Sequence, residues 1–154
     1  MKMNILPKPQ KALSLPGRTK ITQNSHVSGD FKSGVIAAAK FISELGIKGD
    51  GCEIRVLYNP SIEEEGYNLA VNDEVVIEAS HERGVFYALQ SLRQLIDLNG
   101  FSENIKVEDY PAFSWRGFML DESRHFFGSE VVKQILDHMA VSYTHLTLPT
   151  KRIV

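Results

Sequence analysis

The chain has little of what marks a disulfide-stapled, membrane-spanning or nucleic-acid-binding protein. Cys52 is its single cysteine, so no internal disulfide can form, and we expect this thiol to be a small core residue. No apolar run approaches the about 20 residues of a membrane span, and the first residues lack the apolar stretch of a secretory signal. The formal net charge of −2 gives no support for binding nucleic acid or a membrane surface. The native compartment is therefore either the cytoplasm or one reached by a signal outside this chain.

The usual marks of metal and phosphate chemistry are also missing. No Cys/His cluster has the spacing of metal ligands, and no glycine-rich loop of the phosphate-binding type occurs. We therefore expect neither a metal nor a cofactor.

What is present over residues 1–110 is typical of one small α+β domain. The chain of 154 residues is 43% hydrophobic and 23% charged, as in an ordinary soluble domain. In chain order the patterns predict short edge strands within 5–30, a helix over 33–45 capped by Ser33, a strand over 52–58, a hairpin over 66–77 turning at Asn72-Asp73, and a helix over 84–98. This order predicts a small antiparallel sheet with helices on one face.

A different unit follows over residues 111–140. Phe118, Met119 and Leu120 predict a short buried strand, and a helix capped by Ser129 is predicted after it. The charged cluster between them is of the kind that barrel enzymes carry at the ends of their strands. We expect the first βα unit of an incomplete (β/α)₈ barrel, because a complete barrel takes about 250 residues.

Four segments together resemble the β-N-acetylhexosaminidases of glycoside hydrolase family 20. They are Ile5–Gln10, Glu65–Leu69 with Val75–Ala79, Gly84–Leu92, and Trp115–Asp121 with Ser123–Phe126. The first three are partly shared with families 67 and 84, whereas the fourth is specific to family 20. The resemblance runs from about residue 4 to residue 140. It implies an N-terminal domain over 1–110 and the start of the catalytic barrel over 111–140.

The resemblance also implies an activity for the parent enzyme. Family 20 enzymes remove terminal N-acetylhexosamine from glycans or chitooligosaccharides, with retention and with help from the substrate's own acetamido group. An Asp-Glu pair on a later strand orients that group and supplies the general acid/base. Asp121-Glu122 has the same letters, but its flanks match the first strand instead. We therefore expect no catalytic residue in this chain and an inactive fragment. Family members are often periplasmic or secreted.

Arg124 is the residue that the resemblance assigns to the substrate. Its position implies hydrogen bonds to the 3- and 4-hydroxyls of the terminal sugar, and a guanidinium offers several fixed donors for such a pair. The alternative is a structural salt bridge to Asp121. Asp121 and His125 are candidate supporting residues, and His125 fits packing or loop structure better than catalysis. Trp115 could stack on a sugar, but we expect it to pack between the two domains.

The resemblance ends after Ala140, and we expect 141–154 to be a non-native tail. His145 lacks the second histidine of the family's His-x-His pair. Two other functions remain open. Residues 1–110 could form a stand-alone carbohydrate-binding or interaction module, which the predicted barrel strand argues against. The chain could also belong to a related glycosidase family that shares the N-terminal domain, which the segment 123–126 argues against.

Overall fold

The computed structural model of the chain describes residues 5–120 and 125–141. The chain divides into two compact units, Met1–Pro111 and Ala112–Val154, which are described one at a time. Within the described ranges, no helix is long and apolar enough to cross a membrane.

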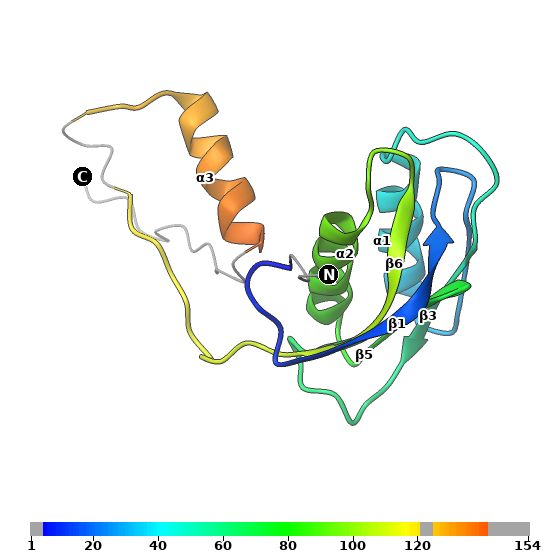
Figure 1. Cartoon of the computed structure of the whole chain (residues 1–154). Coiled ribbons are helices and arrows are strands. Elements are labelled where there is room, and N and C mark those ends of the chain that lie inside the picture. The colour runs from blue at the N-terminus through cyan, green and yellow to red at the C-terminus, as the bar shows by residue number, and fades with distance from the viewer. Residues whose placement is uncertain (1–4, 121–124, 142–154) are drawn as a thin grey trace. The chain divides into compact units, whose positions relative to one another are not determined.

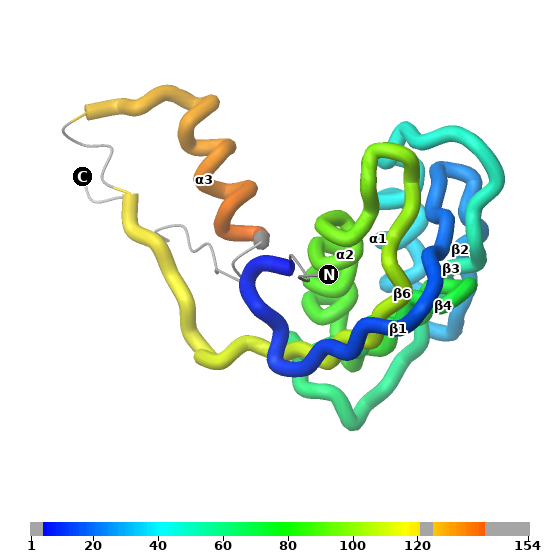
Figure 2. The backbone as a smooth tube through the Cα atoms, viewed as in Figure 1, coloured from blue at the N-terminus to red at the C-terminus, as the bar shows by residue number. Residues whose placement is uncertain are grey.

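The first unit is built on a six-stranded sheet, with strands in the order β1-β6-β4-β5-β3-β2. The strands are β1 (Lys11–Lys20), β2 (His26–Ser28), β3 (Glu53–Tyr58), β4 (Tyr67–Asn72), β5 (Glu74–Ala79) and β6 (Phe101–Asp109). Helices α1 (Lys32–Ser43) and α2 (Glu82–Leu95) contact each other and cover one face of this sheet (Figures 1 and 2). The expected α+β class, with helices on one face, is confirmed.

The sheet is mixed, which corrects the expectation of an antiparallel one. The pairs β1–β6, β4–β6 and β4–β5 are antiparallel, whereas β2–β3 and β3–β5 are parallel. Helix α1 connects β2 to β3, and a parallel pair needs such a crossover connection. The β4–β5 hairpin then folds back so that β5 lies between β4 and β3. The sequence patterns predicted β3 and the β4–β5 hairpin, but the directions of the strands depend on these connections.

The core lies between the sheet and the two helices. Alternate residues of β3, β4 and β5 are fully buried, as expected for strands with one covered face. Helix α2 packs on them through Val85, Ala88 and Leu92, which are also fully buried. The approach is closest at Gly84, where an added Cβ would lie 2.1 Å from the carbonyl oxygen of Gly66. Only a residue without a side chain fits there.

Replacing Gly84 by alanine should therefore destabilise the first unit. Alanine favours a helix by about 1 kcal/mol over glycine, but here the new methyl group meets main-chain atoms that cannot rotate away. Overpacking of this kind costs about 1–3 kcal/mol. We expect Tm to fall by at least about 5 °C in a thermal melt followed by circular dichroism. Gln90→Ala, at a half-buried position of the same helix, is the control and should leave Tm nearly unchanged. An unchanged Tm for Gly84→Ala would contradict this close packing.

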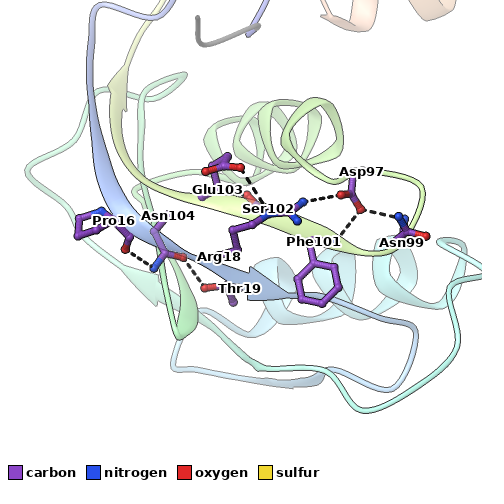
Figure 3. A network of polar contacts seen from close by, with 9 residues as sticks. All are labelled: Pro16, Arg18, Thr19, Asp97, Asn99, Phe101, Ser102, Glu103 and Asn104. Carbon is purple, nitrogen blue, oxygen red and sulfur yellow. Dashed lines mark hydrogen bonds and ion pairs between the residues drawn. The ribbon is translucent and has the colours of Figure 1, made fainter. Parts of the chain in front are cut away.

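A network of polar contacts joins β1 to β6 and to the loop before β6, at the edge of the sheet (Figure 3). The buried Asn104 side chain donates to the carbonyl of Pro16 (3.0 Å) and accepts from Thr19 Oγ1 (2.7 Å). Arg18 pairs with Asp97 and lies over the ring of Phe101. The main-chain N–H of Phe101 donates to Asp97, and this bond holds the pKa of that carboxyl below its usual value. The contacts of Asn104 satisfy buried groups and those of Arg18 join partly exposed residues, all within the fold, so we assign the network a structural role.

In the second unit the predicted helix is present as α3 (Ser129–Val141), and Ser129, the residue expected to cap it, is its first helical residue. Residues 118–120, however, form no strand in the structure, and Phe118 and Met119 are exposed. The prediction of a buried strand is thus wrong for this chain. The physical reason is that a strand is held by ladder hydrogen bonds to a neighbour. No strand of the described segments pairs with 118–120.

Candidate functional site

The site residues expected from the sequence fall at the edge of what the structure describes. Asp121 and Arg124 lie outside the described residues. His125 is exposed, and its ring meets that of Phe127 edge-on, with centroids 4.9 Å apart. Trp115 is 76% exposed in this chain. The roles assigned to Arg124, Asp121 and His125 therefore stay predictions.

The first unit carries a hollow of about 370 Å³, with polar and apolar surface in its lining, where β3 and β6 end and β4 begins. Its lining includes Asn59 and Glu63 of the loop after β3, Asn68 of β4, Glu108 of β6, and Tyr110. The sequence did not indicate this site. Its residues come from two segments far apart in the chain, and no spacing pattern connects them.

The planar polar side chains around this hollow are held by hydrogen bonds on the sheet. Asn68 Nδ2 donates to Glu78 Oε2 (3.0 Å), and Asn59 Nδ2 donates to the same oxygen (3.3 Å). Lys11 Nζ donates to Glu108 Oε1 (2.8 Å), and this contact raises the pKa of Lys11 above its usual value. The side chains of Asn59, Asn68 and Glu108 are therefore held by contacts within the first unit.

Below the hollow, a buried carboxylate ties three elements together. Asp109 is only 7% exposed, and its Oδ1 accepts from the main-chain N–H of Gln10 (3.0 Å). Its Oδ2 accepts from the Tyr67 hydroxyl (3.3 Å), which also shares a 2.6 Å hydrogen bond with Ser91 Oγ. The N-terminal segment, β4 and α2 are thus fixed to the end of β6. This anchor lies just before the chain leaves the first unit at Pro111.

Tyr67→Phe should destabilise the first unit without changing its fold. The substitution removes only the hydroxyl, so buried Ser91 and Asp109 each lose a described hydrogen bond. Such a loss costs about 1–3 kcal/mol, and we expect it as a lower midpoint in urea with an unchanged m-value. Tyr58→Phe is the matched control, because Tyr58 is 53% exposed. Equal midpoints for the two variants would contradict the anchoring role of Tyr67.

The described residues offer neither a metal centre nor an activated thiol. No group of three or more His, Cys, Asp or Glu side chains among them could hold a metal ion. Burial raises the pKa of the Cys52 thiol, which makes it a poor nucleophile near neutral pH. Cys52 was expected to be a small core residue, but it is only half-buried and lies outside the buried core.

Two family models match the chain one after the other. The model for glycosyl hydrolase family 20, domain 2, matches residues 2–110. The model for the catalytic domain of the same family matches residues 113–145. The two matches follow each other in the order that the sequence motifs predicted, with the N-terminal domain first and the start of the catalytic domain second.

Curated relatives agree with these matches over part of their length. A beta-hexosaminidase from Vibrio furnissii is 30% identical over 149 residues, which covers 90% of this chain and 24% of that protein. A beta-hexosaminidase from Akkermansia muciniphila is 40% identical over 86 residues, covering 53% of this chain and 17% of that protein. The chain therefore spans about a quarter or less of the length of these relatives.

Solved structures show the same fold. The exo β-N-acetylglucosaminidase from Vibrio harveyi, in complex with N-acetylglucosamine, matches with a TM-score of 0.76 and 26% identity, covering 90% of this chain and 24% of that one. The β-N-acetylhexosaminidase from Streptomyces coelicolor matches with a TM-score of 0.74 and 25% identity, covering 91% of this chain and 33% of that one. CpGH84B shares the fold alone, with a TM-score of 0.68 and 20% identity.

Proposed function

Because the chain belongs to glycosyl hydrolase family 20, we propose that it is the N-terminal part of an enzyme that removes terminal N-acetylhexosamine from glycans or chitooligosaccharides. The observation that carries this proposal is the pair of adjoining family matches, domain 2 over 2–110 and the catalytic domain over 113–145. The 24% coverage of the Vibrio furnissii relative supports the view that most of the parent enzyme lies beyond this chain.

The proposed domain organisation follows the same division. Residues 1–110 are the N-terminal α+β domain, and 111–140 supply the first βα unit of a catalytic barrel. Helix α3 is the helix of that unit. The strand over 118–120 would form once a neighbouring barrel strand provides its ladder partner. Residues 141–154 are proposed to be a non-native tail.

The proposed reaction is substrate-assisted hydrolysis with retention at the anomeric carbon, as the family resemblance implies. The substrate's acetamido oxygen acts as the nucleophile, while an Asp-Glu pair on a later strand orients it and moves the proton. In this scheme Arg124 holds the 3- and 4-hydroxyls of the terminal sugar, with support from Asp121 and His125. N-acetylglucosamine bound to the Vibrio harveyi structure supports the choice of sugar class.

Recovery of the complete reading frame from the source DNA tests this proposal. The expected result is a continuation through further βα repeats, with an adjacent Asp-Glu pair where one of the barrel strands ends. The encoded protein should then release the aryl group from an aryl N-acetylglucosaminide. A frame that ends without barrel strands would instead favour the stand-alone carbohydrate-binding or interaction module.

A further inference from the structure

We propose that the hollow beside Tyr110 is a carbohydrate-binding site that takes one neutral hexopyranose unit of a glycan. All of its lining residues belong to the first unit, so the site can be tested on this chain as it stands. The inference goes beyond the proposed function, which assigns no ligand to residues 1–110.

The size of the hollow suits a single sugar ring. Small-molecule sites have volumes of about 300–1,000 Å³, and about 370 Å³ lies near the lower end of that range. A longer glycan would place one unit in the hollow and leave its neighbours over the open sheet surface.

The polar lining matches vicinal hydroxyl groups. A sugar hydroxyl both donates and accepts, and an amide or carboxylate can pair with two hydroxyls at once. The amide of Asn68 has two N–H hydrogens, and its contact with Glu78 accounts for one. Glu108 receives Lys11 at Oε1 and has a second carboxylate oxygen. Asn68 and Glu108 are also direct partners across β4 and β6, so they face a ligand from adjacent strands.

Tyr110 adds an aromatic wall to this polar surface. Its side chain is 41% exposed and lines the hollow, so the ring can pack on the C–H groups of a pyranose. Its main chain is fixed, because Gln10 Nε2 donates to the Tyr110 carbonyl (3.3 Å) and the preceding Asp109 is anchored in the core. The main chain that carries this ring is therefore already ordered, so binding need not pay for ordering it.

Charge sets the class of sugar. Three acidic residues, Glu63, Glu108 and Asp109, are among the lining residues of the hollow, and Lys11 pairs with Glu108. A surface of this sign disfavours sulfated or uronic-acid glycans. The geometry therefore points to a neutral sugar.

The test is a two-dimensional NMR titration of the isotope-labelled chain with chitotetraose and, separately, cellotetraose. We expect saturable shifts of the Asn59 and Asn68 side-chain amides and of residues 108–110, with Kd on the order of 1 mM for one or both tetrasaccharides. Tetragalacturonate, an acidic glycan, should bind at least about tenfold more weakly, which corresponds to about 1.4 kcal/mol.

Variants locate the binding. We expect two substitutions to weaken tetrasaccharide binding, each raising Kd about tenfold or more: Tyr110→Ala and Asn68→Ala. Tyr110→Ala keeps the main-chain contact to Gln10. Tyr58→Ala removes another exposed tyrosine, outside the hollow, and should bind as the unaltered chain does. If Asn68→Ala also lowers Tm, its weaker binding could reflect a damaged fold, and the test then depends on Tyr110→Ala alone.

Three outcomes overturn the proposal: no saturable shift with either neutral tetrasaccharide, shifts confined to another surface, or unchanged binding by Tyr110→Ala. Equal or tighter binding of the acidic glycan overturns the assignment to neutral sugars. None of these outcomes bears on the proposed function, which depends on the catalytic barrel and is tested by the recovered reading frame.

Discussion

The purified chain is expected to release no measurable aryl group from an aryl N-acetylglucosaminide, under conditions in which the restored full-length enzyme turns over many times. General acid/base catalysis alone contributes about 10²–10⁴-fold, and the proposed acid/base lies on a strand beyond this chain. The group that would orient the acetamido oxygen lies there too. One βα unit also cannot assemble the barrel face at which several strands meet around a substrate. The chain therefore lacks the acid/base, the orienting group and the assembled barrel face, and we expect the substrate to react no faster than in buffer alone.

The comparison needs controls for trace enzymes of the expression host. A mock purification from the same host sets the background, and the full-length enzyme with glutamine in place of the proposed general-acid glutamate sets the level for a complete but disabled site. Turnover that co-elutes with the chain and exceeds both backgrounds would contradict the proposal that its catalytic groups lie elsewhere.

The parts of the fold that sequence predicted correctly are those set by local patterns. Leu69, Val71, Val75 and Ile77 alternate along two strands, and all four are buried toward the helices. The turn between them was expected at Asn72-Asp73, and the chain does reverse there, with a positive φ of 59° at Asp73. Local chemistry and tertiary packing agree here, so the sequence was sufficient.

Strand β6 was missed because its buried face is partly polar. Ser102, Asn104 and Asp109 are buried within it, and they interrupt the apolar alternation that marks a strand. Two of them have hydrogen-bond partners from elsewhere in the chain, Thr19 for Asn104 and Tyr67 for Asp109. A buried polar residue is recognisable only when its partner is known. The pattern of β6 therefore becomes clear only in the folded unit.

Helix ends were predicted less well than helix bodies. Ser33 was expected to cap the first helix, but α1 already begins at Lys32 and has no side-chain cap. Helix α2 begins at Glu82, two residues before the expected start, because His81 Nδ1 accepts from the N–H of Arg83 (3.2 Å). Histidine is not among the preferred capping residues, so composition gave no reason to expect it.

The two candidate sites show different limits on what can be predicted from the sequence. Arg124 was selected through its place in a family motif, which identifies a role without any geometry. The hollow at Tyr110 was not selected, since strand pairing brings residues 59–68 next to 108–110. A sequence motif and a spatial arrangement are thus complementary sources, and each points to a candidate site that the other does not indicate.

In the full-length enzyme, Arg124→Ala should lower kcat/KM for an aryl N-acetylglucosaminide while leaving the fold intact. The residue follows segment 118–120 by a few positions, and in a barrel this places it at the face that holds active sites. Loss of a hydrogen bond to a charged donor costs roughly 1.5–3 kcal/mol. At ~1.4 kcal/mol per decade this is about a 10- to 150-fold decrease in kcat/KM. Arg93→Ala, which removes an exposed arginine from α2, should leave kcat/KM unchanged.

The competing role for Arg124 is a structural salt bridge to Asp121, and it predicts a different pair of measurements. In that case Arg124→Ala should lower Tm with little effect on kcat/KM, because an unpaired carboxylate would be left in the fold. Adding Asp121→Asn should then restore Tm, since the double variant removes both charges. If Arg124 binds sugar, the double variant should regain no activity. Kinetics and melting on the same preparations therefore separate the roles, and a large fall in Tm with unchanged kcat/KM would make Arg124 a structural residue.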